Sequence, residues 1–303
     1  MIPFEILIED VFFNISLNNS LDPMDNKTVL SLLNDFENGE WRYDKFQRFI
    51  WNNIKETALS HKERQALLND GEDSVLTEAA KSLRIAEDNG KGSEISEILL
   101  YGIMKHHYKA LPVVPKIFYK QNSQDNAKGS DSVHIVIEND DTFSLWLGEA
   151  KFYNDITNAQ LQKIVESVKD SLQLHKLKKE NYIITNVSDL NDLKLSDEIR
   201  QKIFKYLSTD TSIDLLKPIL HIPILLLYEC AITKNETHFT EEYKKQISSL
   251  HKERSTKYFE EQIKSCSDID LYSEIKFHII LFPVPEKEKI VNKFIQKANV
   301  YRL

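Results

Sequence analysis

The chain has 303 residues, of which 41% are hydrophobic and 28% charged, and its formal net charge is −8. These values are ordinary for a globular protein with a sizeable core, and the scarcity of Gly and Pro (7 and 8) argues against extensive disorder. Cys230 and Cys266 form neither a CxxC motif nor a zinc-ligand pattern, which disfavours a zinc site and a disulfide framework.

The N-terminal segment MIPFEILIEDVFF carries acids instead of the basic region of a signal peptide. The most apolar run, residues 222–227, is far too short to span a bilayer. We therefore expect a cytoplasmic protein without membrane segments.

The negative charge is unevenly distributed. Residues 1–90 hold 17 acidic and 9 basic residues, whereas residues 91–303 hold 30 of each. Affinity for nucleic acid rests largely on the neutralisation of phosphate charge. The chain alone is therefore expected to be a poor binder of nucleic acid.

The first part of the chain predicts one strand and three helices. Residues 4–17 alternate loosely between apolar and polar, which is typical of a strand. Helical apolar spacing follows at residues 28–36, 43–59 and 73–87. The turn residues 88–92 then break the pattern, so we place a domain boundary there. Residues 1–90 would form an acidic α+β extension that packs on the rest of the chain.

The second part of the chain alternates strands and helices. Ser93 is placed to cap a helix over 94–109, residues 111–119 are extended, and residues 121–129 form a polar loop. Residues 132–138 and 142–151 predict two strands joined by a turn at 139–141. A long helix over 156–177 follows, and then a mostly helical stretch to about residue 219, which we interpret as a helical insertion at about 178–220. The last part of the chain predicts strands at 222–229 and 275–282 and helices at 241–264 and 285–298. The order predicts an α/β core over residues 91–303, with a central sheet covered by helices.

The hairpin strands carry the candidate site. Glu149 and Lys151 are two residues apart on one strand and project from the same face. Asp131 begins the preceding strand, so a hairpin would bring both carboxylates together. Phosphodiester hydrolysis needs a cation that neutralises charge and activates a water, and Mg²⁺ takes oxygen ligands and keeps several waters. The two acids could share one such ion, with Lys151 close enough to orient or deprotonate the water.

An acid-x-Lys triplet alone is weak support for a nuclease. It occurs at five places: Asp25/Lys27, Glu149/Lys151, Asp192/Lys194, Glu242/Lys244 and Glu274/Lys276. Only the second has a partner acid at the head of an adjoining hairpin strand, and it also ends its strand, where open α/β sheets place ligand sites. A cross-strand ion pair at a sheet edge remains the alternative.

The order of a helix acid, a strand Asp, a Glu-x-Lys strand and a helix resembles the PD-(D/E)xK restriction-endonuclease-like core. Within that superfamily the chain is similar to the HamA family, the nuclease subunits of the Hachiman anti-phage system. The resemblance is densest in residues 90–230. It rests on GSEISEILL (92–100), GSDSVHIVIE (129–138), LWLGEAKFYNDI (145–156) and IPILLLYE (222–229), with LGEAKFY the most specific stretch.

The resemblance implies roles for individual residues. Asp131 and Glu149 would be ligands of Mg²⁺ or Mn²⁺, and Lys151 the catalytic lysine. The helix acid would be Glu97 or Glu94, with Glu97 preferred as a third ligand. Ser130 stands where the superfamily motif has its proline.

The resemblance also implies DNA as the substrate and a helicase partner, HamB, that restrains the nuclease and delivers it to DNA. Gln160, Lys163 and Lys176 are candidate DNA contacts. The alternatives are a solvated side chain for Gln160 and helix capping for the cluster of Lys176, Lys178 and Lys179. A basic groove around Lys163, Lys169 and Lys176 would be the alternative to recruitment by the partner. Two other functions stay open: a non-catalytic nuclease-fold scaffold that binds a helicase, and an RNA-cleaving nuclease.

Overall fold

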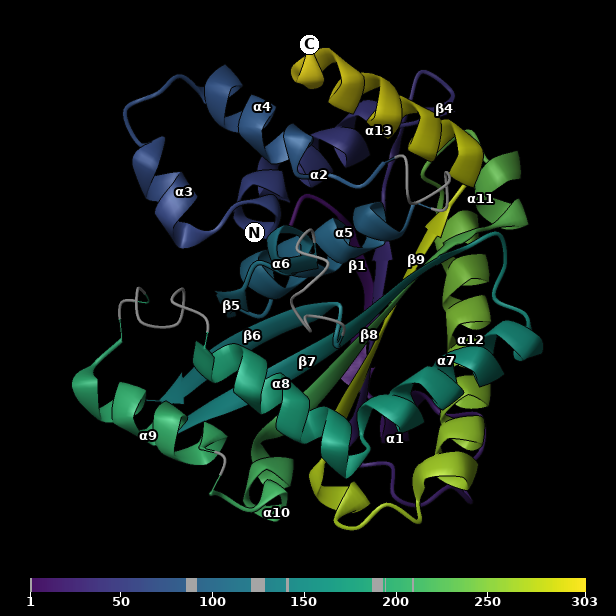
Figure 1. Ribbon diagram of the computed structural model, residues 1–303. Coiled ribbons are helices and arrows are strands. Elements are labelled where there is room, and N and C mark those ends of the chain that lie inside the picture. The colour runs from purple at the N-terminus through teal and green to yellow at the C-terminus, as the bar shows by residue number, and fades with distance from the viewer. Residues whose placement is uncertain are drawn as a thin grey trace.

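The computed structural model describes residues 2–85, 92–120, 129–139, 142–186, 193, 195–208 and 210–303. A seven-stranded mixed sheet lies at the centre, with helices on both faces (Figure 1). Its order is β1 (Glu5–Val11), β2 (Lys27–Leu33), β9 (Lys276–Val284), β8 (Leu220–Glu229), β7 (Thr142–Tyr153), β6 (Ser132–Asn139) and β5 (Leu111–Val114). The predicted α/β fold with a helix-flanked mixed central sheet is confirmed.

The four central strands β2, β9, β8 and β7 run parallel, and the outer pairs are antiparallel. Parallel strands covered on both faces are nearly continuous apolar runs. This explains why the sequences LHIPILLLYE and KFHIILFPV are readily recognised as strands β8 and β9.

Alternating residues of β7 enter two separate cores, because successive side chains on a strand point to opposite faces. Leu145 and Leu147 pack with α7 (Asn158–Ser171) and α12 (Glu241–Cys266). Trp146 and Ala150 pack in the core formed with α2 (Tyr43–Ala58), α5 (Ser93–His106) and α13 (Lys287–Arg302). Glu149 and Lys151 continue the series of Leu145 and Leu147, and therefore face the α7 side.

The other elements surround these two layers. The helices are α1 (Phe12–Ile15), α3 (His61–Ala66), α4 (Glu72–Lys81), α6 (Lys116–Lys120), α8 (Leu174–Asn186), α9 (Asp197–Leu207), α10 (Ile213–Leu216) and α11 (Ala231–Asn235). The short elements are the hairpin β3 (Phe36–Glu37) and β4 (Glu40–Trp41), and the 3₁₀ helices η2 (Lys217–Ile219) and η3 (Tyr272–Glu274). None of the described helices is both long and apolar enough to cross a membrane.

The helix predicted over residues 28–36 is wrong, because this segment forms strands β2 and β3. Val29, Leu30, Leu32 and Leu33 are all buried, since β2 lies between β1 and β9 and is covered on both faces. A short run that is apolar on both faces has no period that separates a strand from a helix.

Three boundaries also differ from the prediction. The first strand ends at Val11 and α1 follows, β5 ends at Val114 before α6 begins, and the long helix over 156–177 is divided into α7 and α8. Gly92, and not Ser93, is the N-cap of α5. Gly92 has a positive φ of 72°, and a Cβ there would be only 2.9 Å from the side chain of Phe152, so glycine is required.

The N-terminal strands belong to the same sheet as the rest of the chain. β2 pairs with β9, from Lys27 opposite Phe277 to Ser31 opposite Leu281. The predicted boundary at 88–92 falls mainly on residues 86–91, which lie outside the described residues, as do residues 121–128 of the predicted polar loop and residues 140–141 of the hairpin turn. The predicted helical stretch contains α8, α9, α10 and η2.

Candidate functional site

The β6–β7 hairpin brings Asp131 beside the end of β7. Ser132 pairs with Gly148, and the backbone N–H of Asp131 donates to the carbonyl of Gly148 at 2.7 Å. The side chain is fixed as well, because its Oδ2 accepts from the backbone N–H of Ala150 at 3.0 Å. Asp131 is therefore held against the strand segment that carries Glu149 and Lys151.

The Lys151 ammonium lies between two carboxylates. Its Nζ is 3.5 Å from Asp131 Oδ2 and forms a close ion pair with Glu149 Oε1. Ser167 of α7 donates its hydroxyl to the same Glu149 oxygen at 2.7 Å. The structure thus brings together the three residues predicted from the hairpin, and adds a hydroxyl from the covering helix.

The charges in this group perturb one another. Burial, together with the negative charge of Asp131, raises the pKa of Glu149. Burial alone would lower the pKa of Lys151, but the charges of Asp131 and Glu149 outweigh it and raise the pKa above its usual value. The two acids repel each other at neutral pH, so the site favours a positive charge between them.

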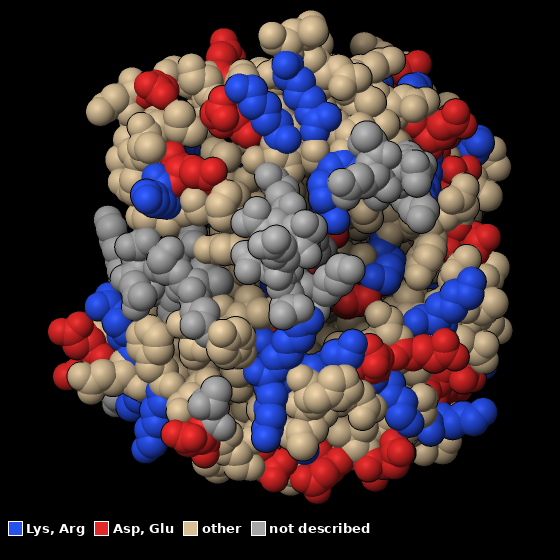
Figure 2. All heavy atoms as spheres, in the orientation of Figure 1, with Lys and Arg blue, Asp and Glu red and all other residues tan. Residues whose placement is uncertain are grey.

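A cavity of about 380 Å³ opens at this group. Residues of β7 and of the segment that leads into β6 form one wall, and residues of α7 and α8 form the other. Figure 1 shows both helices on the same side of the sheet. The lining residues are Gly129, Ser130, Asp131, Glu149, Lys151, Ser167, Asp170, Ser171, Lys176, Lys179 and Glu180. Lys and Arg side chains gather on the surface over α8 (Figure 2), whose first turns hold Lys176, Lys178 and Lys179.

The two candidate helix acids lie in different places. Glu97 is buried and lines a small cavity together with Asp131. Glu94 accepts a hydrogen bond from the backbone N–H of Arg84 at 2.8 Å and lines a cavity beside α13. Within the described part of the chain, no group of three or more His, Cys, Asp or Glu side chains is arranged to hold a metal ion. Glu97 is thus near Asp131 but does not complete a three-carboxylate cluster.

The donor set fits a magnesium ion with few protein ligands. Mg²⁺ takes oxygen ligands, retains several waters and is often bound through one or two carboxylates. Asp131 and Glu149 supply such a pair, and the Lys151 ammonium marks a position where both meet a cation. Their open cavity leaves room for water and for a substrate phosphate.

The predicted DNA contacts are not all at this cavity. Lys176 lines it, and its Nζ is 3.2 Å from Asp170. Gln160 and Lys163 belong to the first two turns of α7, before Ser167, and are not among the lining residues. Lys169 bonds to the carbonyl of Ser265 and pairs with Asp268 at 3.4 Å.

Several cavity residues were not predicted from the sequence. Ser167 lies on the polar side of α7, and nothing local marks it as a partner of Glu149. Lys179 belongs to a basic run with Lys176 and Lys178, and the sequence alone does not assign it to the cavity. Glu180 had a usable signal, because it falls between Leu177 and Ile184 on the buried stripe of α8. A charged residue at a buried stripe position indicates a specific partner.

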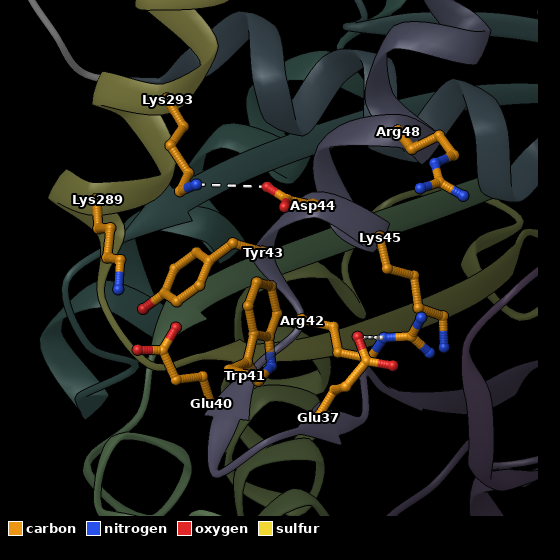
Figure 3. A pocket seen from close by; sticks show the side chains of 10 residues that line it. All are labelled: Glu37, Glu40, Trp41, Arg42, Tyr43, Asp44, Lys45, Arg48, Lys289 and Lys293. Atoms are coloured by element: carbon orange, nitrogen blue, oxygen red, sulfur yellow. Dashed lines mark hydrogen bonds and ion pairs between the residues drawn. The ribbon is translucent and has the colours of Figure 1, made fainter.

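A second polar cavity, of about 280 Å³, lies between α2, the β3–β4 hairpin and α13 (Figure 3). Four of its cations, Arg42, Lys45, Lys289 and Lys293, already have partners. Arg42 pairs with Asp35 at 3.1 Å, Lys293 is 3.3 Å from Asp44, and the Lys289 ammonium lies 4.2 Å from the ring centroid of Tyr43. This cavity is lined by a network of surface ion pairs. It does not bring two acids and a lysine together at one point, as the β6–β7 hairpin does with Asp131, Glu149 and Lys151.

Comparison with known proteins supports a single assignment. The HamA family model matches residues 10–298, which includes every strand of the hairpin site. No curated protein matches the chain. Because the family model covers nearly the whole sequence, the chain belongs to the HamA family.

Proposed function

We propose that this chain is a metal-dependent DNA nuclease of the PD-(D/E)xK type. Membership of the HamA family gives it a role in anti-phage defence, in the Hachiman system. The observation that carries the proposal is the meeting of Asp131, Glu149 and Lys151 in one open cavity. We further propose that a helicase partner, HamB, restrains the nuclease and delivers it to DNA.

Each residue has a defined task in this mechanism. Asp131 and Glu149 would hold Mg²⁺, which supplies neutralisation of phosphate charge and a water of lowered pKa. Lys151 has a raised pKa in this arrangement and is therefore protonated at neutral pH. Its ammonium would orient the water and stabilise charge on the phosphate. Lys176 and Lys179 on the opposite wall would contact neighbouring phosphates.

The proposal is tested by incubating the purified chain with supercoiled plasmid, linear duplex DNA and RNA, in Mg²⁺ or in EDTA, with and without HamB. We expect cleavage of DNA that requires Mg²⁺. Cleavage of RNA alone would change the substrate class. Absence of cleavage in every arm, with HamB present, would favour the non-catalytic scaffold.

The charge distribution predicts that the lone chain binds DNA weakly. Residues 1–90 carry the entire excess of −8 and residues 91–303 are balanced, so no broad positive field gathers DNA. We expect fluorescence anisotropy at physiological salt to show weak binding by the chain and much tighter binding after HamB is added. Tight binding that HamB leaves unchanged would show that the chain recruits its own substrate.

The raised pKa of Glu149 predicts a cleavage rate that depends jointly on pH and metal. Protons compete with the metal for this carboxylate, so activity is lost as the pH falls through its raised pKa, above the usual value of 4.5. A higher Mg²⁺ concentration should stabilise the ionised form and move the acid limb to lower pH. The pH–rate profile at two Mg²⁺ concentrations measures this shift, and an acid limb that does not move would contradict the assignment of Glu149 as a ligand.

A further inference from the structure

A buried ion pair lies behind the candidate site. Lys116 Nζ of α6 is 3.1 Å from Glu180 Oε2 of α8, and their side chains are only 3% and 5% exposed. The residues are 64 positions apart in the sequence. Two charges removed from water in this way need close partners, so the pair fixes α8 relative to the β5–α6 segment.

Glu180 also holds the backbone that leads into Asp131. Its Oε1 accepts a hydrogen bond of 2.6 Å from the backbone N–H of Ser130, the residue immediately before Asp131. A carboxylate that accepts from a backbone N–H makes a strong, charge-assisted bond. The start of β6 is therefore fixed from one side by Glu180 and from the other by the Asp131–Gly148 backbone bond.

Gly129 makes this close approach possible. A Cβ at this position would overlap Glu180 Oε1 and Cδ, so a larger residue would displace the carboxylate. Glu180 lines the cavity beside Lys176 and Lys179, but its oxygens are directed at Lys116 and the Ser130 N–H. It is thus placed to support a neighbour and not to bind the ion itself.

We infer that Glu180 is a positioning residue for the metal ligand Asp131, acting through its hydrogen bond to the Ser130 N–H. The inference rests on the proposed function, because it assumes that Asp131 binds a metal. Groups that hold a metal ligand in place are themselves strong determinants of metal affinity. Glu180 lies on α8 together with Lys176 and Lys179. Its bond to Ser130 therefore also holds these two lysines in a fixed position relative to Asp131.

The test compares two double variants of the full chain. Lys116→Met with Glu180→Met removes both charges of this pair and the acceptor of the Ser130 N–H, so neither partner of the pair is left charged. Lys116→Met with Glu180→Gln also removes both charges, but keeps a side-chain oxygen that can accept from Ser130. The two double variants therefore differ in whether the Ser130 N–H keeps a side-chain acceptor. Thermal unfolding of both variants establishes that they fold.

The affinity of each variant for Mn²⁺ is measured by electron paramagnetic resonance, in the absence of nucleic acid. We expect the Met/Met variant to lose on the order of ten- to a hundredfold in Mn²⁺ affinity, as is usual when support of a ligand is removed. The variant with Lys116→Met and Glu180→Gln should have a Mn²⁺ affinity close to that of the unmodified chain. A role confined to docking α8 would lower thermal stability in both variants without separating their metal affinities.

The outcomes separate this inference from the proposed function. If both variants bind Mn²⁺ as the unmodified chain does, or lose affinity equally, Glu180 does not position Asp131 through Ser130. If the unmodified chain itself binds no Mn²⁺ while Asp131→Ala behaves identically, the metal site is wrong and the inference is overturned with it.

Discussion

Replacement of Lys151 with methionine is expected to reduce DNA cleavage on the order of a hundredfold or more, because a group that orients water or stabilises phosphate charge is lost. Folding should be nearly intact, since the Lys151 side chain is 30% exposed and borders an open cavity. Single-turnover cleavage with saturating Mg²⁺ measures the effect, and circular dichroism checks the fold.

Lys264→Met is the matched control for this variant. Lys264 is an exposed lysine of α12, which shares a hydrophobic core with α7, and it is not among the residues that line the cavity. Its removal should leave the rate of the chemical step unchanged. Cleavage by Lys151→Met at the original rate would assign Lys151 to a structural ion pair, and a variant that unfolds would show that the lysine mainly holds the two carboxylates together.

The carboxylate–lysine group could be predicted because it depends on local geometry. A period of two puts Glu149 and Lys151 on one face of a strand, and a hairpin turn returns the chain past Asp131. Both arguments need only a few neighbouring residues. The structure shows the resulting contacts, with Lys151 beside Asp131 and Glu149.

The side chains that surround Asp131, Glu149 and Lys151 could not be predicted in the same way. Ser167, Lys116 and Glu180 reach the site from three helices, and their positions depend on how those helices pack on the sheet. The same limit explains the error at residues 28–36, where β2 pairs with β1 and β9 at its edges and buries its two faces in the two hydrophobic cores. Local propensity is overridden when tertiary packing covers a short apolar segment on both sides.

Gln160 lies on the predicted face of its helix but too far along the helix axis to reach the site. It lies seven residues before Ser167 and so on nearly the same face of α7, but about 10 Å away along the helix axis. The Oε1 atom of Gln160 is buried and has no hydrogen-bond partner among the residues that the structure describes, yet Gln160 does not line the cavity. The position of Gln160 in the sequence predicts the face of α7 on which its side chain lies, but not its distance from Glu149.

The largest expected effect on stability is at Glu180. Glu180→Leu leaves the Lys116 ammonium buried without its carboxylate, and loss of one partner of a buried pair typically costs about 3–5 kcal/mol. The Ser130 N–H also loses its acceptor, which adds about 1–3 kcal/mol when the group stays buried. Urea unfolding should therefore show a large decrease in the free energy of unfolding for this single substitution.

The double substitution of Lys116→Met with Glu180→Leu should be much less destabilising than Glu180→Leu alone, because neither charge of the pair remains buried. Asp170→Ala provides the surface comparison. Its pair with Lys176 is 63% and 39% exposed, and such pairs contribute about 0–1 kcal/mol. If Glu180→Leu were as mild as Asp170→Ala, the buried pair of Lys116 and Glu180 could not be what fixes α8 to the start of β6.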